Sequence, residues 1–194
     1  MADAGSGRIE RHKGIDRLFH WLTAASVLTL LATGLLPVSG VKFDWVPIHW
    51  MAGVVLTALV LFHLVRSGIW QKLKCMWISA RDLGAKRYGK YSPAQKLMHL
   101  AMTIVILTVV VTGVVMMAKI DTPFWERNPY LLSSSTWGYV YVLHGAAALL
   151  TVTLVMIHVY FGLLGENRMY LRSMIKGWVT REELAVRHDW SGNK

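Results

Sequence analysis

The sequence is nearly without cysteine and poor in acidic residues. Cys75 is the one cysteine among 194 residues, which excludes a disulfide framework, a CxxCH haem attachment and a cysteine-ligated iron–sulfur cluster. Asp and Glu number 11 against 21 Lys and Arg, and none lies inside the long apolar stretches. A carboxylate proton relay within a membrane is therefore not indicated. The histidines form no HxxxH or HxxHH cluster and have no carboxylate or cysteine at ligand spacing, which argues against di-iron and zinc catalysis.

Apolar residues dominate instead. The chain is 54% hydrophobic and only 16% charged, a composition that is typical of an integral membrane protein rather than a soluble domain. The formal charge of +10 does not indicate nucleic-acid binding, because the basic residues lie between apolar segments and form no aromatic-interleaved groove. Residues 1–17 show no apolar h-region, so no signal peptide is evident. We predict an all-α membrane protein without a nucleic-acid partner.

Four apolar stretches are long enough to span a membrane. They cover residues 18–36, 48–65, 97–118 and 138–164, and Pro37 ends the first. We predict a single membrane domain over residues 1–194, with tails at 1–17 and 165–194. His12 and His188 lie in these charged tails and are expected to be solvated.

The distribution of basic residues predicts the orientation. The two tails and the 66–96 loop hold eighteen Lys and Arg, whereas the other two loops hold three: Lys42, Lys119 and Arg127. By the positive-inside rule, both termini face the cytoplasm. The predicted location is the bacterial cytoplasmic (inner) membrane, with multiple passes through lipid.

The two halves of the chain resemble each other. IDRLFHWLTAASVLTLLATGLL in the first span aligns with AQKLMHLAMTIVILTVVVTGVV in the third, which matches His20 with His99 and Gly34 with Gly113. We therefore predict a four-helix bundle made of two related helical hairpins. The repeated Thr-Gly pair either lets a cofactor approach closely or serves ordinary helix packing.

Histidines recur at a fixed spacing in the second and fourth spans. His49 and His63 are fourteen residues apart, as are His144 and His158. Fourteen helical positions turn about 1400° and rise about 21 Å, so both imidazoles of a pair face one side, one near each boundary of a hydrocarbon layer about 30 Å thick. Two such helices form a scaffold for two bis-histidine haems, which must be non-covalent b-type haems.

The predicted orientation gives each histidine a depth. His49 and His144 lie near the outer boundary and form the clearest axial pair. The inner boundary offers four candidates for two axial positions, and spacing does not choose among them: His20, His63, His99 and His158.

Several motifs resemble one known family. IDRLFHW, GKYSPAQK, the TG of the third span, and HGAAALLTVTLVMIHVY followed by SMIKGWVT are similar to the gamma (cytochrome b) subunit of respiratory formate dehydrogenases, one of the four-helix dihaem membrane cytochromes b. The likeness extends over residues 11–180. Cytochrome b subunits of nickel–iron hydrogenases and of thiosulfate or polysulfide reductases share much of this layout.

The resemblance implies an electron-transfer and quinone-reducing subunit that also anchors its complex. Electrons would pass from an external iron–sulfur subunit through two b haems to menaquinone or ubiquinone, with substrate oxidised by a molybdenum- or tungsten-dependent partner. His49 and His144 would hold the outer haem, and His20 and His158 the inner one. His63 and His99 are additions to the family pattern: either could replace His20 as an inner ligand, donate to the quinone or bind a haem propionate.

The same resemblance places the quinone beside the 89–95 loop, with Tyr91, Ser92, Ala94 and Gln95 as candidate contacts. Ser92 and Ala94 depart from the Asn and Gly expected in the family. Four basic residues near the inner boundary could pair with haem propionates or a semiquinone anion, or extend to lipid headgroups: Arg17, Arg66, Lys90 and Arg172. An alternative of another class is a haem-free membrane anchor or transporter subunit whose histidines hydrogen-bond the helices together.

Overall fold

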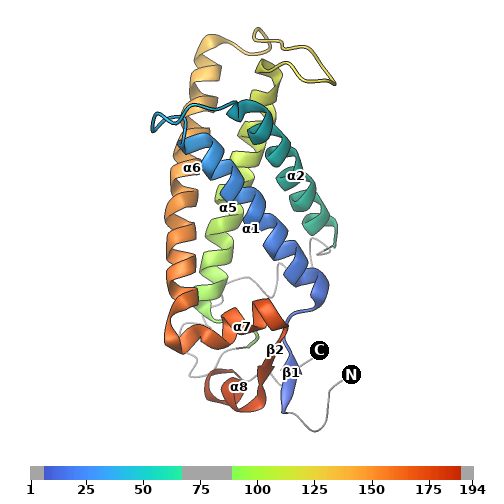
Figure 1. Ribbon diagram of the computed structural model, residues 1–194, viewed down its shortest axis with the longest axis vertical. Helices are drawn as coiled ribbons and strands as arrows, with labels where there is room; N and C mark the ends of the chain where they lie inside the picture. The colour runs from blue at the N-terminus through green and yellow to red at the C-terminus, as the bar shows by residue number, and fades with distance from the viewer. Residues whose placement is uncertain (1–6, 67–88, 189–194) are drawn as a thin grey trace. The chain divides into compact units, whose positions relative to one another are not determined.

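The computed structural model describes residues 7–66 and 89–188. Four long helices dominate these residues: α1 (Gly14–Leu35), α2 (Trp45–Arg66), α5 (Pro93–Met116) and α6 (Ser134–Leu163) (Figure 1). Each is long and apolar enough to cross a membrane. The predicted all-α class with four spans is confirmed. Each helix begins three or four residues before its predicted span, and in α1, α5 and α6 these first residues include polar side chains that the apolar run excludes.

Many large apolar side chains of these helices are exposed, unlike those of a soluble domain. Large apolar side chains such as Leu61, Val111 and Leu149 are about 60% exposed (58%, 60% and 62%). The buried positions include Thr33 and Thr112. Apolar surface of this extent suits contact with lipid, and small polar residues are typical of contacts between membrane helices.

The chain divides into two compact units, which are described separately. The first unit contains residues 1–21, 68–100 and 155–194, and the second contains residues 22–67 and 101–154.

In the first unit, a short antiparallel ladder joins the two ends of the chain. Strand β1 (Arg8–Glu10) pairs with β2 (Trp178–Thr180), and Ile9 lies opposite Val179. A 3₁₀ turn, η2 (Gly165–Asn167), leads into α7 (Arg168–Lys176), which ends at Gly177 with φ of +90°. The Gly177 carbonyl accepts from the backbone N–H groups of Arg11 (2.8 Å) and His12 (3.2 Å), so the turn also anchors the N-terminal segment.

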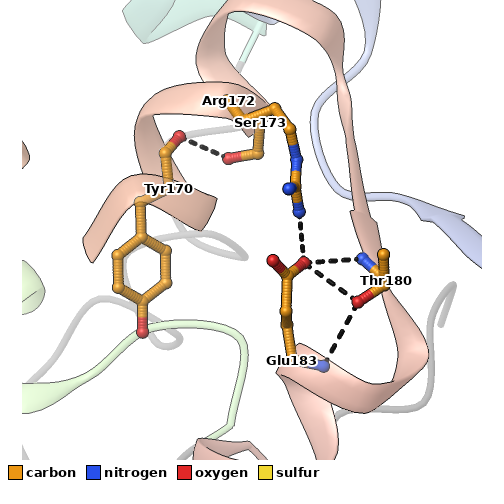
Figure 2. Close-up of polar contacts among 5 residues, drawn as sticks. All are labelled: Tyr170, Arg172, Ser173, Thr180 and Glu183. Carbon is orange, nitrogen blue, oxygen red and sulfur yellow. Dashed lines mark hydrogen bonds and ion pairs between the residues drawn. The ribbon is translucent and has the colours of Figure 1, made fainter. Parts of the chain in front are cut away.

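A polar network connects α7 with the helix that follows it in the same unit. Helix α8 (Arg181–Arg187) begins with a capping box, in which Thr180 and Glu183 exchange hydrogen bonds between side chain and backbone (Figure 2). Glu183 also pairs with Arg172 of α7. Burial tends to raise the pKa of Glu183, but hydrogen bonds from Thr180 and Arg172 outweigh it and lower that pKa. The C-terminal segment is thus folded by specific contacts.

The prediction that His188 is solvated is wrong. His188 is 3% exposed, with Nε2 2.8 Å from the Tyr170 hydroxyl and Nδ1 2.5 Å from the Gly89 carbonyl oxygen. Folding of the C-terminal segment onto residues of this unit removes the imidazole from water, which its charged sequence surroundings did not indicate.

In the second unit, α5 continues into a 3₁₀ turn, η1 (Met117–Lys119). The loop that follows is held by a hydrogen bond from the Trp137 indole to the Pro129 carbonyl oxygen (2.9 Å). The Lys119 ammonium lies 4.5 Å from the ring centre of Trp137, a favourable cation–π distance.

Candidate haem sites

His49 of α2 and His144 of α6 face each other in the second unit. Their ring centres are 6.4 Å apart, and the ring planes make an angle of 69°. A metal–imidazole bond is about 2 Å and the ring centre lies about 1.2 Å behind the ligating nitrogen, so two trans ligands have ring centres about 6.4 Å apart. The separation therefore suits one metal atom between the rings.

A threonine hydroxyl contacts the far side of each of these rings. Thr33 Oγ1 lies 2.8 Å from Nδ1 of His49, and Thr112 Oγ1 lies 2.8 Å from Nδ1 of His144. Both hydroxyls also lie within hydrogen-bond distance of a carbonyl oxygen in their own helix. Hydrogen-bonded partners of this kind fix the orientation of metal-binding histidines. Sequence reasoning missed these two threonines, although each directly precedes the glycine of the repeated Thr-Gly pair.

The two glycines make room for the same rings. A Cβ added at Gly34 would lie 3.5 Å from Cε1 of His49, and one added at Gly113 would lie 3.4 Å from Cε1 of His144. The Thr-Gly pair therefore contacts a histidine in both halves of the chain: the threonine through a hydrogen bond, and the glycine by leaving the helix surface open.

His20 of α1 and His158 of α6 form a second pair, in the first unit. Their ring centres are 6.2 Å apart and their planes make an angle of 47°, again a separation that suits two ligands of one metal atom. Nδ1 of His20 is buried and has no hydrogen-bond partner among the described residues.

These pairs fit haem better than a protein-ligated metal ion. Among residues 7–66 and 89–188, no group of three or more His, Cys, Asp or Glu is placed to hold a metal. Haem iron takes four nitrogens from its macrocycle and needs only axial ligands from the protein. The structure thus brings together four of the six histidines in the spans; His63 on α2 and His99 on α5 stay predictions as alternative ligands.

The candidate quinone loop shows a local structural role. The Ser92 N–H donates to Oε1 of Gln95 (3.0 Å), and the Gln95 N–H donates to the Ser92 hydroxyl (3.3 Å). This reciprocal pattern is a capping box at the start of α5, with Pro93 in the first turn. The S-x-x-Q spacing could have shown it from sequence. Tyr91 lies beside the cations of Arg11 and Lys90, while Ala94 lies in the first turn and is exposed.

The predicted anion-binding cations differ in their surroundings. Arg172 pairs with Glu183 and lies 4.6 Å from the ring centre of Trp178, so it serves the fold of the first unit. Arg17 donates to the Ile175 carbonyl oxygen (2.7 Å). Arg66 is the last residue of α2, and the Lys90 ammonium lies 5.7 Å from the ring centre of Tyr91. Their roles toward propionate or quinone stay predictions.

Sequence reasoning did not single out Arg11, which is 2% exposed. Its guanidinium donates to the Lys90 carbonyl oxygen (2.5 Å) and lies 5.0 Å from the ring centre of Tyr170. Burial lowers the pKa of Arg11, and the nearby tyrosines partly oppose that effect. No apolar run or motif distinguishes Arg11 in the sequence. Its burial is visible only in the folded chain.

The adjacent His12 is also perturbed. Burial, helped by four neighbouring basic side chains, lowers the pKa of His12 to about 4. In order of effect these neighbours are Arg11, Lys90, His20 and Arg17. His12 is therefore neutral at physiological pH, in a strongly positive part of the first unit.

Comparison with known proteins decides the family. The family model described as prokaryotic cytochrome b561 matches residues 11–177, which is most of the chain. The chain belongs to the prokaryotic cytochrome b561 family. This membership makes it a multi-pass membrane cytochrome of the haem b, electron-transfer type. A search of curated proteins finds no match.

Proposed function

We propose that the chain is the dihaem cytochrome b subunit of a respiratory oxidoreductase, which passes electrons from an external iron–sulfur subunit to a membrane quinone and anchors the complex. The observation that carries this proposal is the presence of two histidine pairs, each at the spacing of two axial ligands, in a member of the cytochrome b561 family. Haem b, when bound, supplies one-electron redox chemistry. Oxidation of the substrate belongs to a partner subunit.

Four histidines of this chain hold the two cofactors in this proposal. His49 and His144 bind one haem near the periplasmic boundary, and His20 and His158 bind the other near the cytoplasmic boundary. Support comes from α6, which carries one histidine of each pair, fourteen residues apart, on an unbroken helix. The excess of Lys and Arg in the tails and the 66–96 loop supports the orientation with both termini in the cytoplasm.

The quinone site is proposed near the 89–95 loop. Because Ser92 and Gln95 are engaged in the cap of α5, we assign contact with the quinone first to the neighbouring Tyr91 and Lys90, with His99 and His63 as further candidate donors. Such side chains can hold the ring oxygens and supply protons from the cytoplasmic side.

The proposed catalytic partner is a molybdenum- or tungsten-dependent formate dehydrogenase, supported by the motifs IDRLFHW, GKYSPAQK and SMIKGWVT. A nickel–iron hydrogenase is the second candidate, because the matching family model bears the name of a nickel hydrogenase cytochrome b. Thiosulfate and polysulfide reductases share the layout but have no separate observation in their favour. The haem-free anchor is not proposed, since family membership implies haem b.

Two measurements test the proposal: the haem content of the chain and the identity of the compound that reduces its haems. The full chain is purified with its complex, and haem per chain is measured by pyridine haemochrome. We expect two b haems in the natural chain and one in His144→Ala, because that variant removes an axial ligand. Two haems in His144→Ala would refute the assignment of the His49–His144 pair.

The partner is tested on membranes that contain the chain. Formate or hydrogen is added under anaerobic conditions, and reduction of the haems is followed by the appearance of their α band. Reduction by formate alone supports the first candidate, whereas reduction by hydrogen alone supports the second. Formate dehydrogenase as partner is excluded if hydrogen reduces the haems and formate does not.

A further inference from the structure

Thr33 and Thr112 each contact a histidine ring and backbone carbonyl oxygens of their own helix through a single hydroxyl. Thr33 Oγ1 is 2.7 Å from the Thr29 carbonyl oxygen and 2.8 Å from Nδ1 of His49. In the other half of the chain, Thr112 Oγ1 is 2.6 Å from the Thr108 carbonyl oxygen and 2.8 Å from Nδ1 of His144. The same pair of contacts therefore occurs twice.

The contacts determine which nitrogen of each histidine carries the proton. A hydroxyl has one hydrogen and two lone pairs, whereas a carbonyl oxygen can only accept. The hydroxyl therefore donates its hydrogen to the carbonyl oxygen, and its own oxygen presents a lone pair to Nδ1. Nδ1 must then be the donor. In the opposite tautomer the hydroxyl would have to donate to Nδ1, which would leave the threonine hydroxyl oxygen and the carbonyl oxygen less than 3 Å apart with no hydrogen between them. In both histidines, Nε2 is consequently the nitrogen with a free lone pair.

We infer that Thr33 and Thr112 are positioning residues: they hold His49 and His144 in the ligating tautomer and lower the reduction potential of the haem bound between these histidines below that of the haem between His20 and His158. This inference rests on the proposed function. A hydrogen bond donated by Nδ1–H makes the imidazole a stronger base toward the metal. A stronger axial donor stabilises the oxidised, more positive iron, which lowers the potential.

The His20–His158 pair has different surroundings. Nδ1 of His20 has no hydrogen-bond partner among the described residues, so the corresponding strengthening is absent from that ring. Charge acts in the same direction. The described residues of the first unit hold eleven Lys and Arg against five Asp and Glu, whereas those of the second unit hold four against three. A more positive unit disfavours the oxidised state of an iron within it and raises the potential, an effect that water and salt weaken with distance.

The two effects together give the electron path a direction. With the orientation proposed above, the haem of lower potential lies toward the external donor and the haem of higher potential lies toward the quinone. Electron movement from the periplasmic to the cytoplasmic side is then favourable between the two sites.

The test uses the full chain in its purified complex, with an optical redox titration that resolves the two haem waves. Thr33→Val removes one hydroxyl at nearly constant volume, and Thr33→Ser retains it; Thr112→Val and the double valine variant extend the series. Thr151→Val is the matched control, because Thr151 is a buried threonine of the second unit whose hydroxyl donates to the Ala147 carbonyl oxygen (2.8 Å). Haem per chain is measured in every variant.

We expect each valine substitution to move the lower-potential wave upward and leave the other wave in place, with a larger shift in the double variant and none in Thr33→Ser or Thr151→Val. Loss of one haem in Thr33→Val, with two retained in Thr33→Ser and Thr151→Val, also supports the positioning role. The inference is overturned if the valine variants keep both haems with unchanged potentials, if the higher wave moves instead, or if Thr151→Val has the same effect. A natural chain without haem would overturn the proposed function itself.

Discussion

Gly113 offers a size-dependent test of the His49–His144 pair. A Cβ at this position would lie 3.4 Å from Cε1 of His144, the short end of ordinary contact. Alanine should therefore fit, and its higher helix propensity gives up to about 1 kcal/mol in its favour. A γ carbon extends about 1.5 Å further, so a leucine side chain directed at the ring must displace it by more than 1 Å. Overpacking of this kind costs about 1–3 kcal/mol.

The expected results are two haems per chain in Gly113→Ala and one in Gly113→Leu, because an axial bond of about 2 Å does not survive displacement of its ligand by more than 1 Å. The assay is pyridine haemochrome on the purified complex, together with the α band of the reduced spectrum. Gly145→Leu is the matched control: Gly145 directly follows His144 but is exposed, and a Cβ there meets nothing within 4 Å.

Gly34 provides an independent copy of the experiment, since its Cβ would lie 3.5 Å from Cε1 of His49. Retention of both haems with an unchanged spectrum in Gly113→Leu and Gly34→Leu would refute the view that these glycines make room for axial ligands. Haem loss in Gly145→Leu as well would show that the effect is general to bulky residues in the span.

Two further predictions concern the first unit. The pKa of His12 is lowered to about 4 in the folded chain, so the unfolded state binds more protons between pH 6.5 and 4. The free energy of unfolding should therefore fall as pH falls through that window. Thermal melts of His12→Gln should lack this part of the pH dependence. If melts of the two proteins change in parallel with pH, the burial of a neutral His12 is refuted. Ser92→Ala should destabilise the chain by about 1 kcal/mol through loss of the α5 cap. Thermal melts can measure this loss without quinone present. An unchanged melting temperature combined with a raised KM for quinone would instead favour direct contact between Ser92 and quinone.

Much of the fold was predictable because it depends on local properties of the chain. The four spans follow from apolar length. Their starts were missed by three or four residues; in α5, for example, Gln95 and Lys96 belong to the helix but not to the apolar run. The two capping boxes, at Ser92 and Thr180, follow short motifs that were present in the sequence and were not used.

The contacts of the C-terminal segment were not predictable in the same way. His188 lies in a charged stretch, which ordinarily indicates solvent exposure. Its burial depends on Tyr170 and on Gly89, and the ladder that begins this fold joins residues 8–10 to residues 178–180. Pairing over such a separation leaves no periodic signal in either segment.

The sequence by itself determined that four helices span a membrane and that histidines fourteen residues apart face one side of a helix, since the helical period fixes angles within one element. It also showed the repeated Thr-Gly pair. Only the tertiary structure brought His20 to His158 and His49 to His144, and set Thr33 and Thr112 against the latter two rings. The reason is physical: the helical period fixes where a side chain lies around its own axis, whereas the rotation of one helix against its neighbour is set by packing between them.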